Sequence, residues 1–79
     1  MNKTRGQAML PISFSKAGET VTVRRVGGKP EVRQHLSDLG FVDGAEVEVV
    51  QAQEGNLIIK VKGSRLAITK EMAEKIMVQ

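Results

Sequence analysis

Residues 38–50 read DLGFVDGAEVEVV, with Gly40 and Gly44 placed just before a run in which apolar and acidic residues alternate. In the segment before them, apolar residues recur at the spacing of one helix face: Val32, Leu36 and Leu39. Gly40 follows that stripe at the position where a helix ends in the left-handed region, which a residue without a Cβ adopts at no steric cost. We therefore predict a helix that ends at Gly40, and a tight turn at Gly44 that leads into a strand.

The start of this helix and the strand before it are also visible in the pattern. Pro30 suits the first helical position, where its missing N–H would have had no intrahelical partner. Upstream, Val21 and Val23 alternate with polar residues from Thr20 onward, which predicts a half-buried first strand. Val26 breaks that alternation, so we predict a bulge near Arg25.

The alternation after Gly44 predicts a hairpin of residues 45–51 and 57–62 centred on Glu54. In this register Glu48 lies opposite Lys60, and opposite charges across a strand pair are favourable. The same register predicts three further cross-strand pairs: Val47 with Val61, Val49 with Ile59, and Glu46 with Lys62.

The remaining elements follow from turn and capping residues. Gly63-Ser64 predicts a two-residue hairpin turn that pairs Val61 with Leu66 and Ile59 with Ile68. Thr69 is a good N-cap for a short helix through Lys75, and residues 76–78 are apolar enough to form a closing strand. Residues 9–14 are apolar, but Pro11 removes a backbone donor and favours an edge strand or a loop lying against the core.

Together these elements predict an all-β domain, a small five-stranded barrel resembling an SH3-like fold. One helix lies between the first and second strands, and a short helix lies near the C-terminus. Residues 1–8 are polar and are predicted to be a flexible N-terminal tail, which leaves residues 9–79 as the single folded domain.

Composition narrows the classes of function. The chain of 79 residues has no cysteine, which excludes disulfides, thiolate metal sites and a cysteine nucleophile. No apolar run approaches membrane-spanning length, and no apolar segment of signal-peptide type follows the N-terminus. We interpret the protein as soluble and cytoplasmic. With one histidine and no nucleophile beside an activating base, we do not expect an enzyme.

Over residues 9–79 the order and spacing of these motifs resemble the ferrous-iron transport protein A (FeoA) family of small SH3-like domains. The matching segments are Ala17-Gly18-Glu19 before Val21-x-Val23, then Val32-Arg33-x-x-Leu36-x-x-Leu39-Gly40-Phe41-Val42-x-Gly44 with Val47-x-Val49, then Val61-Lys62-Gly63-Ser64-Arg65-Leu66-Ala67-Ile68, and finally Ala73-x-x-Ile76-x-Val78.

The resemblance implies an accessory role in bacterial ferrous-iron uptake. The implied partner is the cytoplasmic part of a membrane ferrous-iron transporter that carries a GTP-binding domain, so the protein would be peripheral at the inner face of the membrane through its partner. An alternative implied by the same resemblance is a metal-responsive regulatory domain, as at the C-terminus of iron- and manganese-dependent repressors. No helix-turn-helix precedes the domain, so we expect the free-standing form.

The sequence offers one set of candidate metal ligands, Glu31, His35 and Asp38, which lie at i, i+4 and i+7 of the predicted helix. Imidazole and carboxylates can bind a divalent ion, and the resemblance makes Fe²⁺ the ion to consider. No cofactor is required by any motif. The alternative is a solvated helix face, since metal sites gather ligands from more than one element.

The candidate partner-binding residues lie around the connection between the first strand and the helix: Arg24, Arg25, Lys29, Arg33, Phe41 and Val42. We predict a protein-docking surface here, and the alternative is a solvated basic rim with Phe41 folded into the core. A net charge of +3 makes nucleic-acid binding the rival class. Nucleic acid is not the expected partner, because the chain has only two aromatic residues on which bases could stack.

Overall fold

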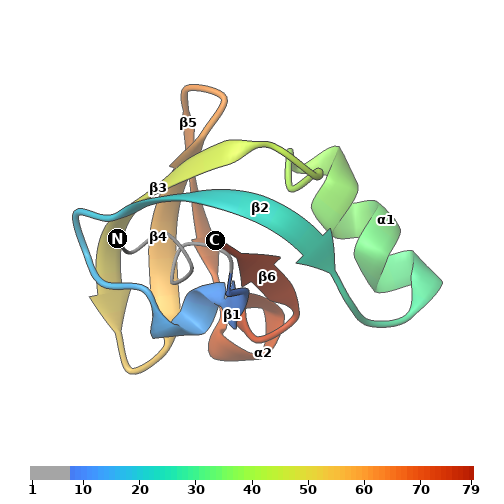
Figure 1. The fold of residues 1–79 in the computed structure, drawn as a ribbon, viewed down its shortest axis with the longest axis horizontal. Helices are drawn as coiled ribbons and strands as arrows, with labels where there is room; N and C mark the ends of the chain where they lie inside the picture. The colour runs from blue at the N-terminus through green and yellow to red at the C-terminus, as the bar shows by residue number, and fades with distance from the viewer. Residues whose placement is uncertain (1–7) are drawn as a thin grey trace.

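An antiparallel sheet bends around an aliphatic core in the computed structural model, which describes residues 8–79 (Figure 1). The strand order within the described residues is β1-β6-β2-β3-β4-β5. In chain order the elements are β1 (Leu10–Pro11), the 3-10 helix η2 (Ile12–Phe14), β2 (Thr20–Val26), α1 (Pro30–Asp38), β3 (Glu46–Gln53), β4 (Asn56–Val61), β5 (Ser64–Ile68), α2 (Lys70–Ala73) and β6 (Ile76–Val78).

The predicted fold class is confirmed: strands dominate, one helix separates β2 from β3, and a short helix precedes the last strand (Figure 1). The predicted count of five strands is one too low, because the two residues of β1 pair with β6 at the edge of the sheet. Pro11 fits there, since an edge strand does not need every backbone donor. The predicted flexible tail falls almost wholly on residues 1–7, which lie outside the described residues.

Helix α1 ends as the glycine pattern predicts. The Phe41 N–H donates to the Leu36 carbonyl at 3.0 Å, and the Gly40 N–H donates to the Ser37 carbonyl at 2.9 Å. These are the two bonds of a Schellman motif, with Gly40 in the left-handed region at φ +111°. Leu36 and Phe41, the two positions at which such a motif usually makes a hydrophobic contact, both belong to the buried core cluster.

Strand β2 joins the two halves of the sheet by pairing with β3 on one side and β6 on the other. Its register against β6 shifts between Val23 and Arg25, which confirms the bulge predicted near Arg25. A bulge re-aims side chains. As a result Arg24 and Arg25 are both exposed, although they are consecutive in the strand, while Val23 is buried before them.

The β3–β4 hairpin has the predicted register next to Glu48, but its turn is different. Glu48 lies opposite Lys60 and Val49 opposite Ile59, as predicted. The turn is not centred on Glu54. It is a two-residue turn at Glu54-Gly55, with φ of +54° and +89°, and a bulge between Val49 and Gln51 compensates for the difference.

The predicted pairs at the other end of this hairpin lie beyond the observed register, which begins at Glu48. On the other side of β3, Glu46 and Val47 pair with Thr22 and Val21 of β2. Lys62, the predicted partner of Glu46, has already left β4 for the next turn. Among the described residues no ion pair within 4 Å joins a glutamate of β3 to a lysine.

The β4–β5 turn was predicted one residue too late. It is formed by Lys62-Gly63, with φ of +53° and +79°, rather than by Gly63-Ser64. Leu66 therefore lies opposite Ile59, and Ile68 opposite Leu57. The predicted register was off by two residues, which leaves every side chain on its predicted face because the strand period is two.

Helix α2 begins where predicted. The Thr69 Oγ1 accepts a bond from the Met72 N–H at 3.3 Å, and the Asn56 Oδ1 accepts one from the Lys70 N–H at 2.8 Å. The second bond ties the β3–β4 turn to the start of the helix. The helix ends at Ala73, two residues before the predicted Lys75, and the predicted closing strand is β6.

The two glycines around Phe41 provide a test of the fold. Gly40→Ala should destabilise the protein more than Gly44→Ala, although both positions have positive φ, which costs a residue with a Cβ about 1–2 kcal/mol. A Cβ at Gly40 would also meet the Val61 side chain at 3.2 Å, whereas a Cβ at Gly44 has nothing within 4 Å. Urea unfolding measures the difference, and equal losses for the two variants would contradict this account of Gly40.

Candidate docking groove

An open groove of about 560 Å³ lies between the end of β2 and helix α1. Its polar lining comes from Arg24, Arg25, Arg33, Gln34, Ser37 and Asp43, and its apolar lining from Val26, Pro30, Phe41 and Val42. Within α1, the lining positions are 30, 33, 34 and 37, which is the i, i+3, i+4, i+7 spacing of one helix face. The groove is therefore built on two regular elements.

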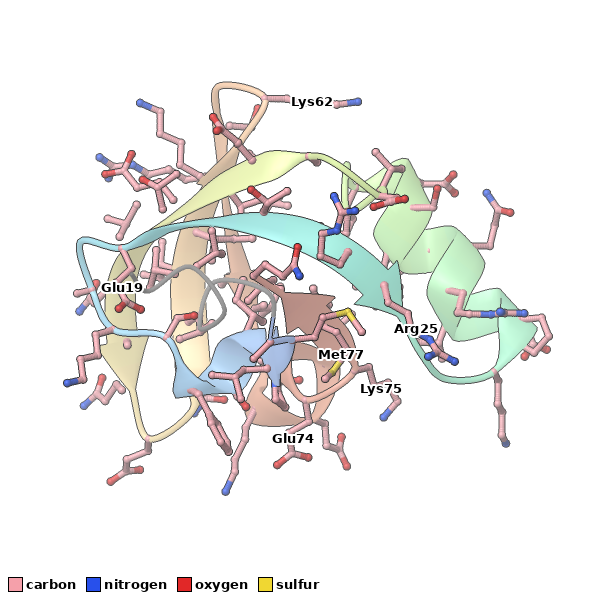
Figure 2. All side chains as sticks on the ribbon, viewed as in Figure 1. Glu19, Arg25, Lys62, Glu74, Lys75 and Met77 are labelled. Atoms are coloured by element: carbon pink, nitrogen blue, oxygen red, sulfur yellow. The ribbon has the colours of Figure 1, made fainter. Side chains whose placement is uncertain are left out.

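The arginines enter the groove from both walls. The β2 bulge presents Arg24 and Arg25, and α1 presents Arg33. Figure 2 shows Arg25 at the end of β2, beside the connection that leads into α1. A guanidinium offers donors in a planar fork that matches a carboxylate or a phosphate. The groove is thus suited to a ligand with negative charge.

One acidic side chain partly balances these charges. The Arg24 Nη1 lies 3.5 Å from the Asp43 Oδ1, and the two side chains are 41% and 71% exposed. At that exposure an ion pair contributes about 0–1 kcal/mol. Within residues 8–79, neither Arg25 nor Arg33 has a carboxylate within 4 Å. Among the described residues, two of the three guanidiniums are therefore without an ion-pair partner.

The structure brings together most, but not all, of the residues predicted for partner binding. Lys29 is exposed and precedes α1 as its N-cap residue, but it does not line the groove. Phe41 touches the groove, yet its side chain is 1% exposed and belongs to the core. Of the two roles considered for Phe41 from the sequence, this burial agrees with the one in which it folds into the core and not with a surface contact. Val42, 40% exposed, is an apolar residue of the groove that a partner can reach.

The three candidate metal ligands of α1 do not converge. Glu31 and His35 line a separate hollow between α1 and α2, together with Val32, Glu71, Met72 and Lys75. Asp38 lies outside that hollow and accepts a hydrogen bond from the Gln34 Nε2 at 2.9 Å. In residues 8–79 no group of three His, Cys, Asp or Glu side chains is arranged to hold a metal ion.

The interior of the described chain is apolar. All buried side chains among residues 8–79 are apolar. None of the helices in that range is long and apolar enough to cross a membrane.

Asp43, Gln34 and Ser37 were missed as groove residues by the sequence analysis. The helical face that contains Pro30, Arg33, Gln34 and Ser37 could have been found from spacing alone, since it is the face beside the buried stripe. The position of Asp43 next to Arg24 could not, because it depends on how the loop after Gly40 returns to β2.

Comparison with known proteins gives a consistent result. The family model of the FeoA domain matches residues 10–79. "Putative Fe(2+) transport protein A" of Methanocaldococcus jannaschii is 38% identical over 71 residues, covering 90% of this chain and 87% of that protein.

Two solved structures extend the comparison to the fold. The crystal structure of an iron uptake regulatory protein (FeoA) has a TM-score of 0.82 at 33% identity, covering 91% of this chain and 96% of that one. The zinc complex of Stenotrophomonas maltophilia FeoA, described as an SH3 domain protein, has a TM-score of 0.74 at 26% identity, covering 86% and 87%. The SH3-like fold is thereby confirmed.

The assignment of Phe41 to the core and of Val42 to the surface can be tested with two neighbouring truncations. Phe41→Ala should cost about 3–5 kcal/mol of unfolding free energy, because it removes a fully buried aromatic ring. Val42→Ala should change it by about 0.5 kcal/mol or less, as is usual for surface positions. Urea denaturation followed by far-UV circular dichroism gives both values, and similar losses for the two variants would contradict the assignment.

Proposed function

The chain belongs to the FeoA family, and on that premise we propose that it is a small accessory protein of ferrous-iron uptake that acts by binding another protein. The relative with 38% identity is named for Fe²⁺ transport, and that relative is matched over most of its length. In this proposal the protein catalyses no reaction. It supplies a docking surface, and transport is performed by its partner.

We infer that the partner is the cytoplasmic part of a membrane ferrous-iron transporter that carries a GTP-binding domain. This places the protein in the cytoplasm, at the inner face of the membrane when it is bound to its partner. Transport of Fe²⁺ and any hydrolysis of GTP then take place in the transporter. The docked domain biases the transporter's conformation or assembly through the contact itself.

The observation that carries the proposal is the groove between β2 and α1. It combines the guanidiniums of Arg24, Arg25 and Arg33 with the exposed apolar side chain of Val42. Arginine is enriched where proteins bind proteins, and charge complementarity raises the rate and the specificity of association. Because the groove walls are a strand and a helix, the backbone that carries these side chains is expected to move little when the partner binds.

A protein partner fits this groove better than a nucleic acid. Proteins that bind single-stranded nucleic acids stack bases on exposed aromatic rings. The aromatic ring in the groove, Phe41, is buried. Phe14 is 68% exposed, but it lines a different hollow with Leu10 and Val78.

The proposal predicts that one charge reversal in the groove weakens docking strongly without unfolding the domain. Arg33→Glu should weaken capture of the full-length transporter, in detergent-solubilised membranes, by about tenfold or more, since it replaces attraction by repulsion. The matched control is Arg65→Glu, which reverses an exposed arginine on β5, outside the groove. Both variants should keep the far-UV spectrum and the unfolding midpoint of the wild type to within a few degrees.

Growth under iron limitation gives the functional readout. In a strain that lacks the chromosomal gene, Arg65→Glu should restore iron-dependent growth and Arg33→Glu should not. Transporter capture and growth that are both normal with Arg33→Glu would contradict the proposal. Equal losses in the two variants would show that capture depends on overall charge rather than on the groove.

A further inference from the structure

We propose that the groove recognises an acidic linear segment, in which carboxylates flank one apolar side chain, and that Asp43 competes internally for the same arginines. This inference rests on the proposed function, because the segment would belong to the partner that docks there. It goes further by stating the chemistry of the partner's contact and by giving Asp43 a role. The segment need only be a few residues long to span the groove between β2 and α1.

The positive charge of the groove favours a ligand that carries carboxylates. Arg25 and Arg33 have no carboxylate within 4 Å in the described residues, and Arg24 shares one with Asp43. A carboxylate can accept two parallel N–H bonds from a guanidinium, which gives direction as well as attraction. An incoming segment with carboxylates on either side of its centre can therefore satisfy donors on both walls.

The uncharged residues that line the groove indicate which kind of side chain lies between the carboxylates of the bound segment. Val42 is 40% exposed, and Pro30 and Val26 also line the groove. One aliphatic side chain can pack on them. Gln34 and Ser37 lie on the same face of α1 and offer hydrogen bonds to a peptide backbone. This mixture is suited to a peptide and is unnecessary for a polyphosphate backbone.

Asp43 already places a carboxylate beside one of these arginines. It comes from the loop between α1 and β3, and its Oδ1 lies 3.5 Å from Arg24. Because the Asp43 side chain is 71% exposed, this pair is weak and an incoming carboxylate can displace it. Asp43 also repels an acidic ligand for as long as it stays in the groove. Removing its charge should therefore strengthen binding of an acidic segment and weaken binding of a basic one.

A short synthetic peptide tests the inference directly. The probe is a fluorescein-labelled peptide Glu-Glu-Leu-Glu-Glu, titrated with the whole protein at low salt and followed by fluorescence anisotropy. Asp43→Asn should tighten binding about two- to fivefold, and Arg33→Gln should weaken it about tenfold. Arg65→Gln, outside the groove, should leave the dissociation constant unchanged. The neutral peptide Gln-Gln-Leu-Gln-Gln should not bind, and affinity for the acidic one should fall as salt is added.

Several results would overturn the inference. One is equal binding of the acidic and neutral peptides, and another is weaker binding of the acidic peptide by Asp43→Asn. A third is tighter, Arg33-dependent binding of a ten-nucleotide oligothymidine, which would identify the occupant as a nucleic acid. Urea unfolding of each variant confirms that differences in affinity do not come from unfolding.

The inference and the proposed function can fail separately. If the acidic peptide does not bind while capture of the transporter still depends on Arg33, only the acidic segment is wrong. If capture of the transporter is independent of Arg33, the proposed docking role of the groove is wrong even when the peptide binds.

Discussion

The closure of helix α1 by Gly40, which follows its last turn, is the constraint on which the β2–α1–β3 region depends. Two backbone bonds close the helix, from Gly40 to Ser37 and from Phe41 to Leu36, and they require the positive φ of Gly40. The closure directs Phe41 into the core and leaves Val42 and Asp43 at the surface. The chain then returns to β2, where the Gly44 N–H donates to the Val23 carbonyl at 2.7 Å and the Val23 N–H donates to the Ala45 carbonyl at 2.8 Å.

This arrangement explains why the groove is a fixed feature. One wall is β2, held between β3 and β6, and its bulge turns Arg24 and Arg25 outward together. The other wall is α1, anchored by Leu36 in the core. The recognition surface therefore follows from the same backbone features that stabilise the domain, and the described residues add no buried polar network to it.

Much of the fold was predictable from the sequence, because the spacing of apolar residues and the positions of turn and capping residues indicated the same elements. The stripe of α1, the bulge in β2 and the cap at Thr69 were each indicated by local chemistry. Both misplaced hairpin turns begin with a residue other than glycine at positive φ, Glu54 and Lys62, and the bulge between Val49 and Gln51 also shifts the β3–β4 turn. Sequence patterns favour Gly, Asn or Asp at such positions. The side chains of β5 were still assigned to the correct faces of the sheet, because a register error of two residues preserves the alternation of side chains between the faces.

The site was less predictable than the fold. The arginines could be placed from their positions in a strand and a helix, but the burial of Phe41 depends on how the helix closes in three dimensions. Helical spacing likewise suggested that Glu31, His35 and Asp38 act together, whereas Asp38 is bonded to Gln34 and lies outside the hollow that contains the other two. Spacing on one helix predicts a shared face, and it does not predict a shared ligand.

The most direct measurement of which face docks is a titration of the ¹⁵N-labelled protein with the isolated cytoplasmic part of the transporter, followed by amide chemical shifts. Our account predicts that the largest changes fall on the end of β2, on the α1 face that contains Arg33 and Gln34, and on Val42 and Asp43. Changes concentrated on β5, on Leu10 of the edge strand β1 or on the exposed Phe14 of η2 would contradict it.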